Sequence, residues 1–260
     1  MDLGSILGVV IAAVGIIVGM YLEGGSILQI LQPTAGMIVF GGTIGACMIA
    51  FPLKTFIQSF KDLKKLIFEP KANGEELIKE LVGYAHKARK DGILALEAEL
   101  PKVKDPFLRK SLGSAVDGVE PKAARAAMEL EIQFAEEHGE QVPKVFESAG
   151  GFAPTVGILG AVLGLIQVMQ HLDNINEVGH GIAVAFVATI YGVGAANLFF
   201  LPAAGKLKIK HRQEIVVREM MVEGVIGILE GLSPRLLEDR LRAFVAHEMH
   251  KIEKSGGEKE

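Results

Sequence analysis

The chain has 260 residues, of which 50% are hydrophobic and 22% charged, and its formal net charge of −4 favours neither nucleic acid nor a strongly acidic partner. Its single cysteine, Cys47, excludes an intrachain disulfide and a cysteine-based metal cluster. The hydrophobic residues gather in long uncharged runs, which is typical of a membrane protein rather than of a soluble domain.

Four runs without Asp, Glu, Lys or Arg are long enough to cross a bilayer, since about 20 apolar helical residues span its hydrocarbon core. No basic residue precedes the first run and no small-residue cleavage site follows it, so we expect a retained membrane helix there and not a signal peptide. The predicted spans are Leu3–Leu22, Ala35–Leu53, Gly150–Leu172 and Gly181–Ala204.

The basic residues predict how these spans are oriented. All 27 Lys and Arg lie in segment 54–144 or segment 206–259, and the connectors Glu23–Thr34 and Asp173–His180 contain none. Basic residues stay on the cytoplasmic side of a membrane. We therefore expect both termini in the cytoplasm and four parts: a membrane hairpin (1–53), a cytoplasmic helical domain (54–149), a second hairpin (150–204), and a cytoplasmic C-terminal helix and tail (205–260).

Outside the spans, apolar residues recur at helical spacing and no run alternates like a β-strand, so the predicted fold class is all-α. Gly92, Pro101 and Pro106 are expected to interrupt the helices. The polar segment Glu253–Glu260 is expected to lack regular structure. The expected helices are Phe51–Phe68, Glu75–Lys90, Ala123–Glu137 and Ile209–Leu232.

The predicted spans contain no carboxylate or ammonium group, which a chain that conducts protons alone is expected to carry. Either the chain is a passive scaffold, or another polypeptide supplies the ionisable group. Small residues are dense in the spans and favour close helix packing in an oligomeric assembly. They are the pairs Gly15 with Gly19 and Gly41 with Gly45, and the series Gly157, Gly160 and Gly164.

Two prolines lie in the second hairpin, Pro154 near the start of the third span and Pro202 near the end of the fourth. Each removes a backbone donor, and it either bends its helix or marks a helix end. The sequence contains neither a metalloprotease motif nor a phosphate-binding loop, so we expect no enzyme and no bound cofactor or metal. His171 and His180 flank the outer connector, where a solvated surface is favoured over metal binding.

Three groups of segments together resemble a known family. They are Ala153–Leu165, then Ala185–Gly192 with Asn197 and Pro202, and then Ala88–Gly92 with Leu96–Glu99. With the four-span layout, they resemble the flagellar motor stator A subunit (MotA/PomA), within the MotA/TolQ/ExbB proton channel family, over nearly the whole chain.

The resemblance implies an ion channel that depends on a partner. In the family, A subunits form a homo-oligomeric ring, expected here to be a pentamer, in the bacterial inner membrane. The ring surrounds two B subunits (MotB/PomB), each of which brings a membrane helix with an ion-binding Asp. Ion passage turns the ring and exerts torque on the rotor switch protein FliG. One charge crossing the membrane yields about 2.3 kcal/mol per 100 mV, so a few ions per step suffice.

The resemblance also implies roles for single residues. Pro154 and Pro202 match the prolines that couple ion passage to conformational change, and Thr189 matches a threonine near the partner's Asp. A hydrogen bond to its own helix is the alternative for Thr189. Ala161 stands where sodium-using relatives carry a hydroxyl; since an oxygen ligand suits a hard cation, Ala161 favours protons over Na⁺. The residues that match rotor-binding positions are Arg89, Lys90, Glu97 and Glu99, for which a solvated helix face is the alternative.

Two other interpretations remain open, and a third is disfavoured. An ExbB/TolQ-type energiser of outer-membrane processes is expected to have three spans and an outside N-terminus. A non-conducting membrane scaffold is compatible with uncharged spans. A secondary transporter is disfavoured, because four spans without an evident repeat leave little room for one.

Overall fold

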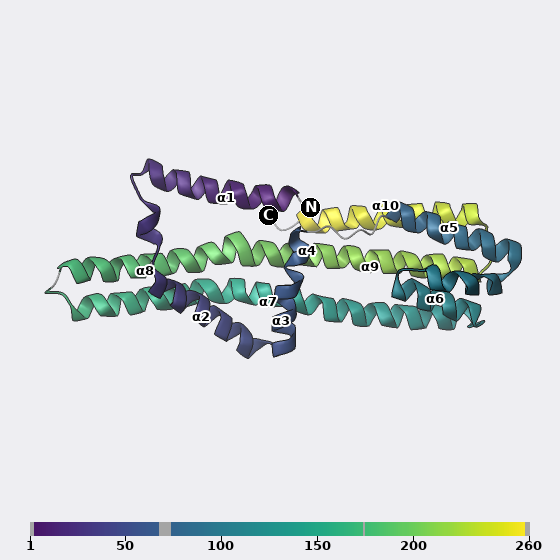
Figure 1. The fold of residues 1–260 in the computed structure, drawn as a ribbon, viewed down its shortest axis with the longest axis horizontal. Coiled ribbons are helices and arrows are strands. Elements are labelled where there is room, and N and C mark those ends of the chain that lie inside the picture. Colours follow the sequence, from purple (N-terminus) through teal and green to yellow (C-terminus); the bar gives the residue numbers. More distant parts are fainter. Residues whose placement is uncertain (1–2, 68–73, 174, 258–260) are drawn as a thin grey trace. The chain divides into compact units, whose positions relative to one another are not determined.

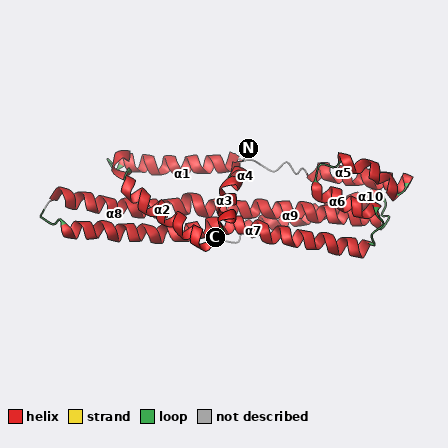
Figure 2. Ribbon diagram, turned by 60° about the horizontal axis from the view of Figure 1, so that its bottom comes forward, coloured by secondary structure: helices red, strands yellow, loops and turns green. Residues whose placement is uncertain are grey.

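The structure is a computed structural model that describes residues 3–67, 74–173 and 175–257. Its regular structure is helical, and these residues contain no strand (Figures 1 and 2), which confirms the all-α prediction. The chain divides into two compact units, a first unit of 1–69 with 140–208 and a second unit of 70–139 with 209–260. Two long helices, α7 (Pro121–Gln170) and α9 (Leu201–Leu229), contribute residues to both units.

The first unit holds the apolar helices. In it, α8 runs alongside the later part of α7, and α2 packs across α8 (Figure 1). The Pro33 ring begins α2, where its missing N–H would be unpaired in any case. The elements are α1 (Leu3–Leu22), η1 (Ile27–Ile30), α2 (Pro33–Ala50), α3 (Leu53–Asp62), α4 (Lys64–Ile67), α8 (Ile175–Ala195) and the π-helical segment η3 (Ala196–Phe200).

Three helical stretches of the described chain are long and apolar enough to cross a membrane: Pro33–Ala50, Pro121–Gln170 and Glu177–Leu229. In α1 the apolar stretch Leu7–Leu22 is shorter, and none of the α1 side chains that the structure describes is buried. The apolar helices confirm a membrane protein. The four-span arrangement and the four domain limits stay predictions.

The second unit packs around an apolar core. Gly92 adopts φ 83°, which lets the chain turn from α5 into η2. The Asp105 carboxylate accepts a hydrogen bond from Leu108 N (2.9 Å) and caps α6. Besides parts of α7 and α9, the elements are α5 (Gly74–Asp91), η2 (Ile93–Lys102), α6 (Pro106–Val116) and α10 (Pro234–Gly257). The largest core side chains include Leu81, Leu96, Leu108, Leu112, Ile226 and Leu237.

Several predicted boundaries were wrong. The expected helix Ala123–Glu137 continues into the expected third span as the single helix α7, and the fourth span continues through η3 into α9. Polarity changes at these joins, and turn signals (Pro143 and the pair Gly150 and Gly151) lie near the first, yet α7 runs through them without a break. The expected helix Phe51–Phe68 divides at Leu63 within its described part.

Two predictions about breaks also fail. Pro101 lies inside η2 instead of interrupting a helix, whereas Gly92 and Pro106 stand at element boundaries as expected. Residues Glu253–Gly257, expected to lack regular structure, belong to α10. The rest of that segment, 258–260, lies outside the described residues.

Candidate functional site

Glycine residues bring the backbones of α7 and α8 into direct contact. A Cβ placed on Gly157 would lie 2.9 Å from the Ala188 carbonyl oxygen, and one on Gly192 would lie 2.5 Å from the Ala153 carbonyl oxygen. Such distances leave no room for a side chain, so the two helices pack backbone against backbone. The predicted close packing at Gly157, Gly160 and Gly164 is confirmed.

The glycine pairs of the predicted first hairpin behave differently. A Cβ on Gly15, Gly19, Gly41 or Gly45 would meet nothing within 4 Å. Among the described residues, these pairs therefore contact no other helix of the same chain. Their packing in an oligomer stays a prediction.

The two prolines of the predicted second hairpin do not mark clear helix ends. Pro154 lies inside α7, which continues to Gln170. Pro202 is the second residue of α9. The preceding residue, Leu201, follows η3 directly, and its N donates to the Ala196 carbonyl oxygen five residues earlier. A proline ring clashes with the carbonyl four residues before it, and the wider π turn relieves that clash. The π turn could not be read from the sequence.

Three of the four predicted ion-path residues lie on the helix pair α7 and α8, and the fourth, Pro202, lies on α9. Pro154 and half-buried Ala161 are on α7, on either side of Gly157, and a Cβ on Gly157 would lie 3.5 Å from Thr189 Cα. Thr189 is half-buried, and its Oγ1 donates to the Ala185 carbonyl oxygen (3.3 Å), which is the alternative considered for it. Pro202 lies exposed on α9. The structure thus places Thr189 against the α7 segment that carries Pro154 and Ala161.

Two more polar groups of the apolar helices have positions that the sequence did not predict. Tyr191 Oη donates to the Ile30 carbonyl oxygen (2.5 Å) and accepts from Gln32 N (3.2 Å), which ties α8 to the connector before α2. Thr43 is 1% exposed, and its Oγ1 has no hydrogen-bond partner among the described residues. A buried polar atom without a partner is rare because it is costly. Neither the hydrogen bonds of Tyr191 nor the burial of Thr43 could be predicted from a single sequence.

A mainly apolar cavity of about 620 Å³ with a few polar side chains lies where α7 ends and α8 begins. In it, His171 Nε2 is 3.3 Å from Glu177 Oε2, and His171 Nδ1 is 3.0 Å from the Gln167 carbonyl oxygen. Within the described ranges, no three His, Cys, Asp or Glu side chains are grouped to hold a metal ion.

The predicted rotor-binding residues fall into two groups in the second unit. Arg89 and Lys90 at the end of α5, and Glu97 on η2, are exposed. Glu99 is half-buried and accepts hydrogen bonds from Lys87 Nζ (2.5 Å) and Lys102 Nζ (3.0 Å). These hydrogen bonds, that of Lys87 first, lower the pKa of the Glu99 carboxyl. The structure therefore leaves Arg89, Lys90 and Glu97 available to a partner and engages Glu99 within the unit.

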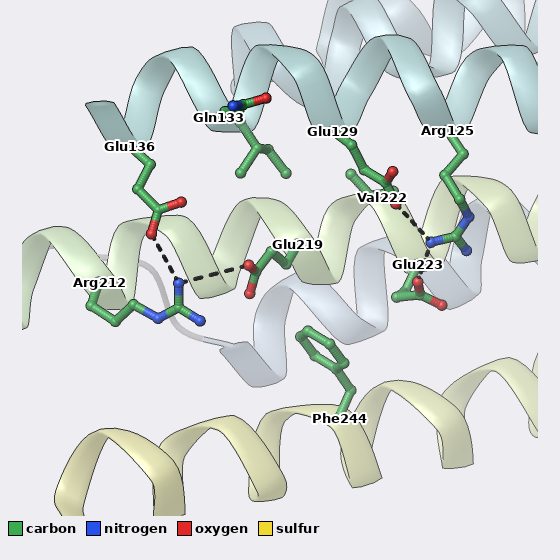
Figure 3. A pocket seen from close by; sticks show the side chains of 10 residues that line it. Arg125, Glu129, Gln133, Glu136, Arg212, Glu219, Val222, Glu223 and Phe244 are labelled. Atoms are coloured by element: carbon green, nitrogen blue, oxygen red, sulfur yellow. Dashed lines mark hydrogen bonds and ion pairs between the residues drawn. The ribbon is translucent and has the colours of Figure 1, made fainter. Parts of the chain in front are cut away.

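Charged side chains join α7 to α9 within the second unit (Figure 3). Arg125 Nη1 donates to Glu223 Oε1 (2.6 Å), Arg240 Nη2 of α10 lies 2.6 Å from Glu223 Oε2, and Arg212 Nη1 lies 3.3 Å from Glu136 Oε1. The hydrogen bond with Glu223 raises the pKa of Arg125. The recess beside these pairs holds about 450 Å³. Since each of these arginines has an acidic partner, the network stabilises the unit.

The structure combines long apolar helices, which pack through glycine, with a second helical unit that carries many charged residues. These features define the class of helical membrane proteins with a large polar domain. Two family models match this chain: the MotA/TolQ/ExbB proton channel family over residues 99–220, and the motility protein A N-terminal model over residues 6–92.

Full-length relatives narrow the class. Motility protein A of Bacillus subtilis is 40% identical over 94% of this chain and 91% of its own length. Chemotaxis protein PomA of Vibrio alginolyticus is 32% identical over 94% of this chain and 96% of its own. The structure of C. jejuni MotAB matches with a TM-score of 0.89 at 34% identity, covering 94% of this chain and 96% of that one. The flagellar MotAB stator complex of Bacillus subtilis matches with a TM-score of 0.86 at 40% identity, covering 95% and 98%. The chain belongs to the MotA/TolQ/ExbB proton channel family, in its motility protein A branch.

Proposed function

We infer that this chain is a stator subunit of the flagellar motor, and we propose that with a B-type subunit it forms a transmembrane ion channel that converts ion flow into torque. The observation that carries the inference is the likeness to motility protein A and to MotAB structures over nearly the whole chain. The motility-specific N-terminal model also matches, over residues 6–92, which disfavours an ExbB/TolQ-type energiser. The function proposed is that of a channel and motor subunit rather than an enzyme.

The partner supplies the ionisable group. The predicted spans contain no carboxylate, and a proton path through a bilayer needs a group that takes up and releases the ion. The related solved structures are C. jejuni MotAB and the flagellar MotAB stator complex of Bacillus subtilis. A MotB/PomB-like subunit with an ion-binding Asp in its membrane helix meets this need, and a non-conducting scaffold does not require one.

The membrane arrangement follows from the basic residues. Four spans in two hairpins, in the bacterial inner membrane with both termini in the cytoplasm, keep all 27 Lys and Arg on the cytoplasmic side. Open space beside Gly15, Gly19, Gly41 and Gly45 supports packing of the first hairpin against neighbouring copies in a ring, proposed to be a pentamer.

The residue roles complete the proposal. Pro154 and Pro202 bend the helix pair as ions pass, Thr189 lies beside the partner's Asp, and Ala161 leaves the path without the oxygen that Na⁺ requires, so the ion is H⁺. The second unit acts on the rotor protein FliG through Arg89, Lys90 and Glu97, with Glu99 fixing the shape of the segment that carries Glu97.

Complementation tests the function directly. The chain and its cognate B subunit are expressed in flagellated cells that lack both stator subunits. Swimming that requires both chains is the expected result. Immotile cells in which both chains reach the membrane and assemble would contradict the proposal.

A further inference from the structure

A short amphipathic helix, α3, follows α2 and leaves an apolar edge uncovered in the described structure. Leu53, Ile57 and Phe60 lie at i, i+4 and i+7 and are 57%, 47% and 51% exposed. Their spacing places them on one side of the helix. Burying this edge in another apolar environment is therefore favourable.

The opposite side of α3 packs against the rest of the first unit. Ser59 is 1% exposed, and Thr55 Oγ1 donates to Gln141 Oε1 of α7 (3.4 Å). Beyond the break, Leu63 and Leu66 pack against the buried cluster that includes Phe146 and Leu207. The docking fixes which edge of α3 is left exposed.

A row of lysines adjoins the exposed apolar edge. Lys54 and Lys61 directly follow Leu53 and Phe60 in sequence, and Lys64 lies on the next helical segment. All three are exposed, and the described chain offers none of them an ion-pair partner. In contrast, Lys144 and Lys208 of the same unit pair with Glu140 and Glu147. The unpaired positive charge of α3 is thus unusual in this unit.

The position of α3 fits the surface of a bilayer. The candidate span α2 ends at Ala50, and after Phe51 and Pro52 the chain turns into α3, which crosses the direction of α7 in both ribbon views (Figures 1 and 2). A helix that crosses the direction of membrane-spanning helices directly after a span lies in the plane of the interface. There an apolar edge enters the acyl region and flanking lysines reach the headgroups.

We propose that α3 is a binding site for anionic phospholipid headgroups, with Leu53, Ile57 and Phe60 in the bilayer and Lys54, Lys61 and Lys64 on the phosphates. Positive charge beside an apolar edge selects an anionic lipid over a zwitterionic one. The inference requires α2 to cross the membrane, and it does not depend on the stator function.

Site-specific fluorescence tests the site, because the chain contains no Trp. Phe60→Trp places a probe on the apolar edge, and the full chain with its B subunit is reconstituted in vesicles of phosphatidylcholine and phosphatidylglycerol. Either lipid is brominated in turn at the same mole fraction, so that quenching reports which lipid touches the probe. A Tyr21→Trp chain is the matched control, because its probe is 58% exposed in a segment (1–53) without Lys or Arg.

We expect brominated phosphatidylglycerol to quench the Phe60→Trp probe about threefold more than brominated phosphatidylcholine, and the ratio to fall with added salt. Adding Lys54→Gln, Lys61→Gln and Lys64→Gln returns the ratio to that of the Tyr21→Trp control, while size-exclusion chromatography shows the complex intact. Equal quenching by the two lipids with the lysines present overturns the proposal. Absence of quenching by both lipids also overturns it and assigns the edge to a protein partner, such as a second copy.

Discussion

At Gly157 a single methyl group has no room. The Cβ of Gly157→Ala would lie 2.9 Å from a backbone oxygen of Ala188, so α7 and α8 must separate to admit it. We expect a loss of about 1–3 kcal/mol of stability, seen as a lower midpoint of thermal unfolding in detergent.

Gly151, on the same helix, provides the control, since a Cβ there meets nothing within 4 Å. Gly151→Ala should leave the midpoint nearly unchanged. Equal effects of the two substitutions would show that the backbone contact at Gly157 is not what limits stability.

Rotor contact is tested at Arg89 and Glu97, both exposed. Reversing both charges (Arg89→Glu with Glu97→Lys) should impair swimming and leave the stator complex assembled, because long-range charge steers a transient contact more than it stabilises it. Torque is measured on tethered cells and assembly by co-purification. Lys122→Glu, which reverses an exposed charge elsewhere in the second unit, should swim normally. Normal swimming of the double variant would refute the assignment.

Glu99 predicts a pH dependence. Its pKa is lowered from an ordinary value of 4.5 by hydrogen bonds from Lys87 and Lys102. As the pH falls, Glu99 therefore takes up its proton in the unfolded chain before it does so in the folded chain. The stabilisation from the Glu99 contacts is complete above pH 4.5 and is lost as the pH falls through the lower pKa of the folded state.

The measurement compares thermal midpoints of the unmodified chain and Glu99→Gln from neutral to acid pH. Their difference should be constant near neutrality and shrink in acid. A difference that persists unchanged in acid would mean that the two lysine contacts do not stabilise the fold.

Among the elements, α7, α9 and α10 of the second unit meet at Glu223, whose side chain is 16% exposed and pairs with both Arg125 and Arg240. Glu223→Gln removes the charged partner of Arg240 and leaves Arg125 with only the exposed Glu129. We expect it to lower stability by about 1–2 kcal/mol, or the thermal midpoint by about 2–6 °C.

Glu129 is the matched control for this network. Its side chain is 58% exposed and lies 3.5 Å from the same Arg125. Because exposed pairs contribute little, Glu129→Gln should cost less than about 0.5 kcal/mol. If Glu129→Gln lowers the stability as much as Glu223→Gln does, then the burial of Glu223 is not the reason why its ion pairs stabilise the fold.

The elements themselves were largely predictable from composition and spacing. Helix α5 begins and ends within one residue of the expected Glu75–Lys90, because its apolar spacing and Gly92 are local signals. The continuous helices across the joins within α7 and from α8 to α9 were not predictable. A change from polar to apolar residues shows that the environment of a helix changes, but it does not show where the helix ends. The roles of Glu99 and Thr189 come from the family resemblance and stay predictions, whereas the lysine contacts of Glu99 could not be predicted because Lys87 and Lys102 approach it only in the folded unit.

At the scale of the whole molecule, the proposed ion conduction depends on a partner, because an apolar helix pair without its own carboxylate carries ions only when another chain supplies one. The energy is sufficient, since each charge crossing the membrane releases about 2.3 kcal/mol per 100 mV. The rival interpretation, a non-conducting membrane scaffold, predicts no ion flux even when the partner is present.

The most direct measurement records cytoplasmic pH in cells that express this chain with its cognate B subunit, whose plug segment, where one exists, has been removed. We predict acidification on energisation that requires both chains and disappears when the partner's membrane Asp becomes Asn. Sodium-dependent flux without a pH change would keep the family and overturn the role given to Ala161. No flux of either ion through an assembled complex would contradict the central claim.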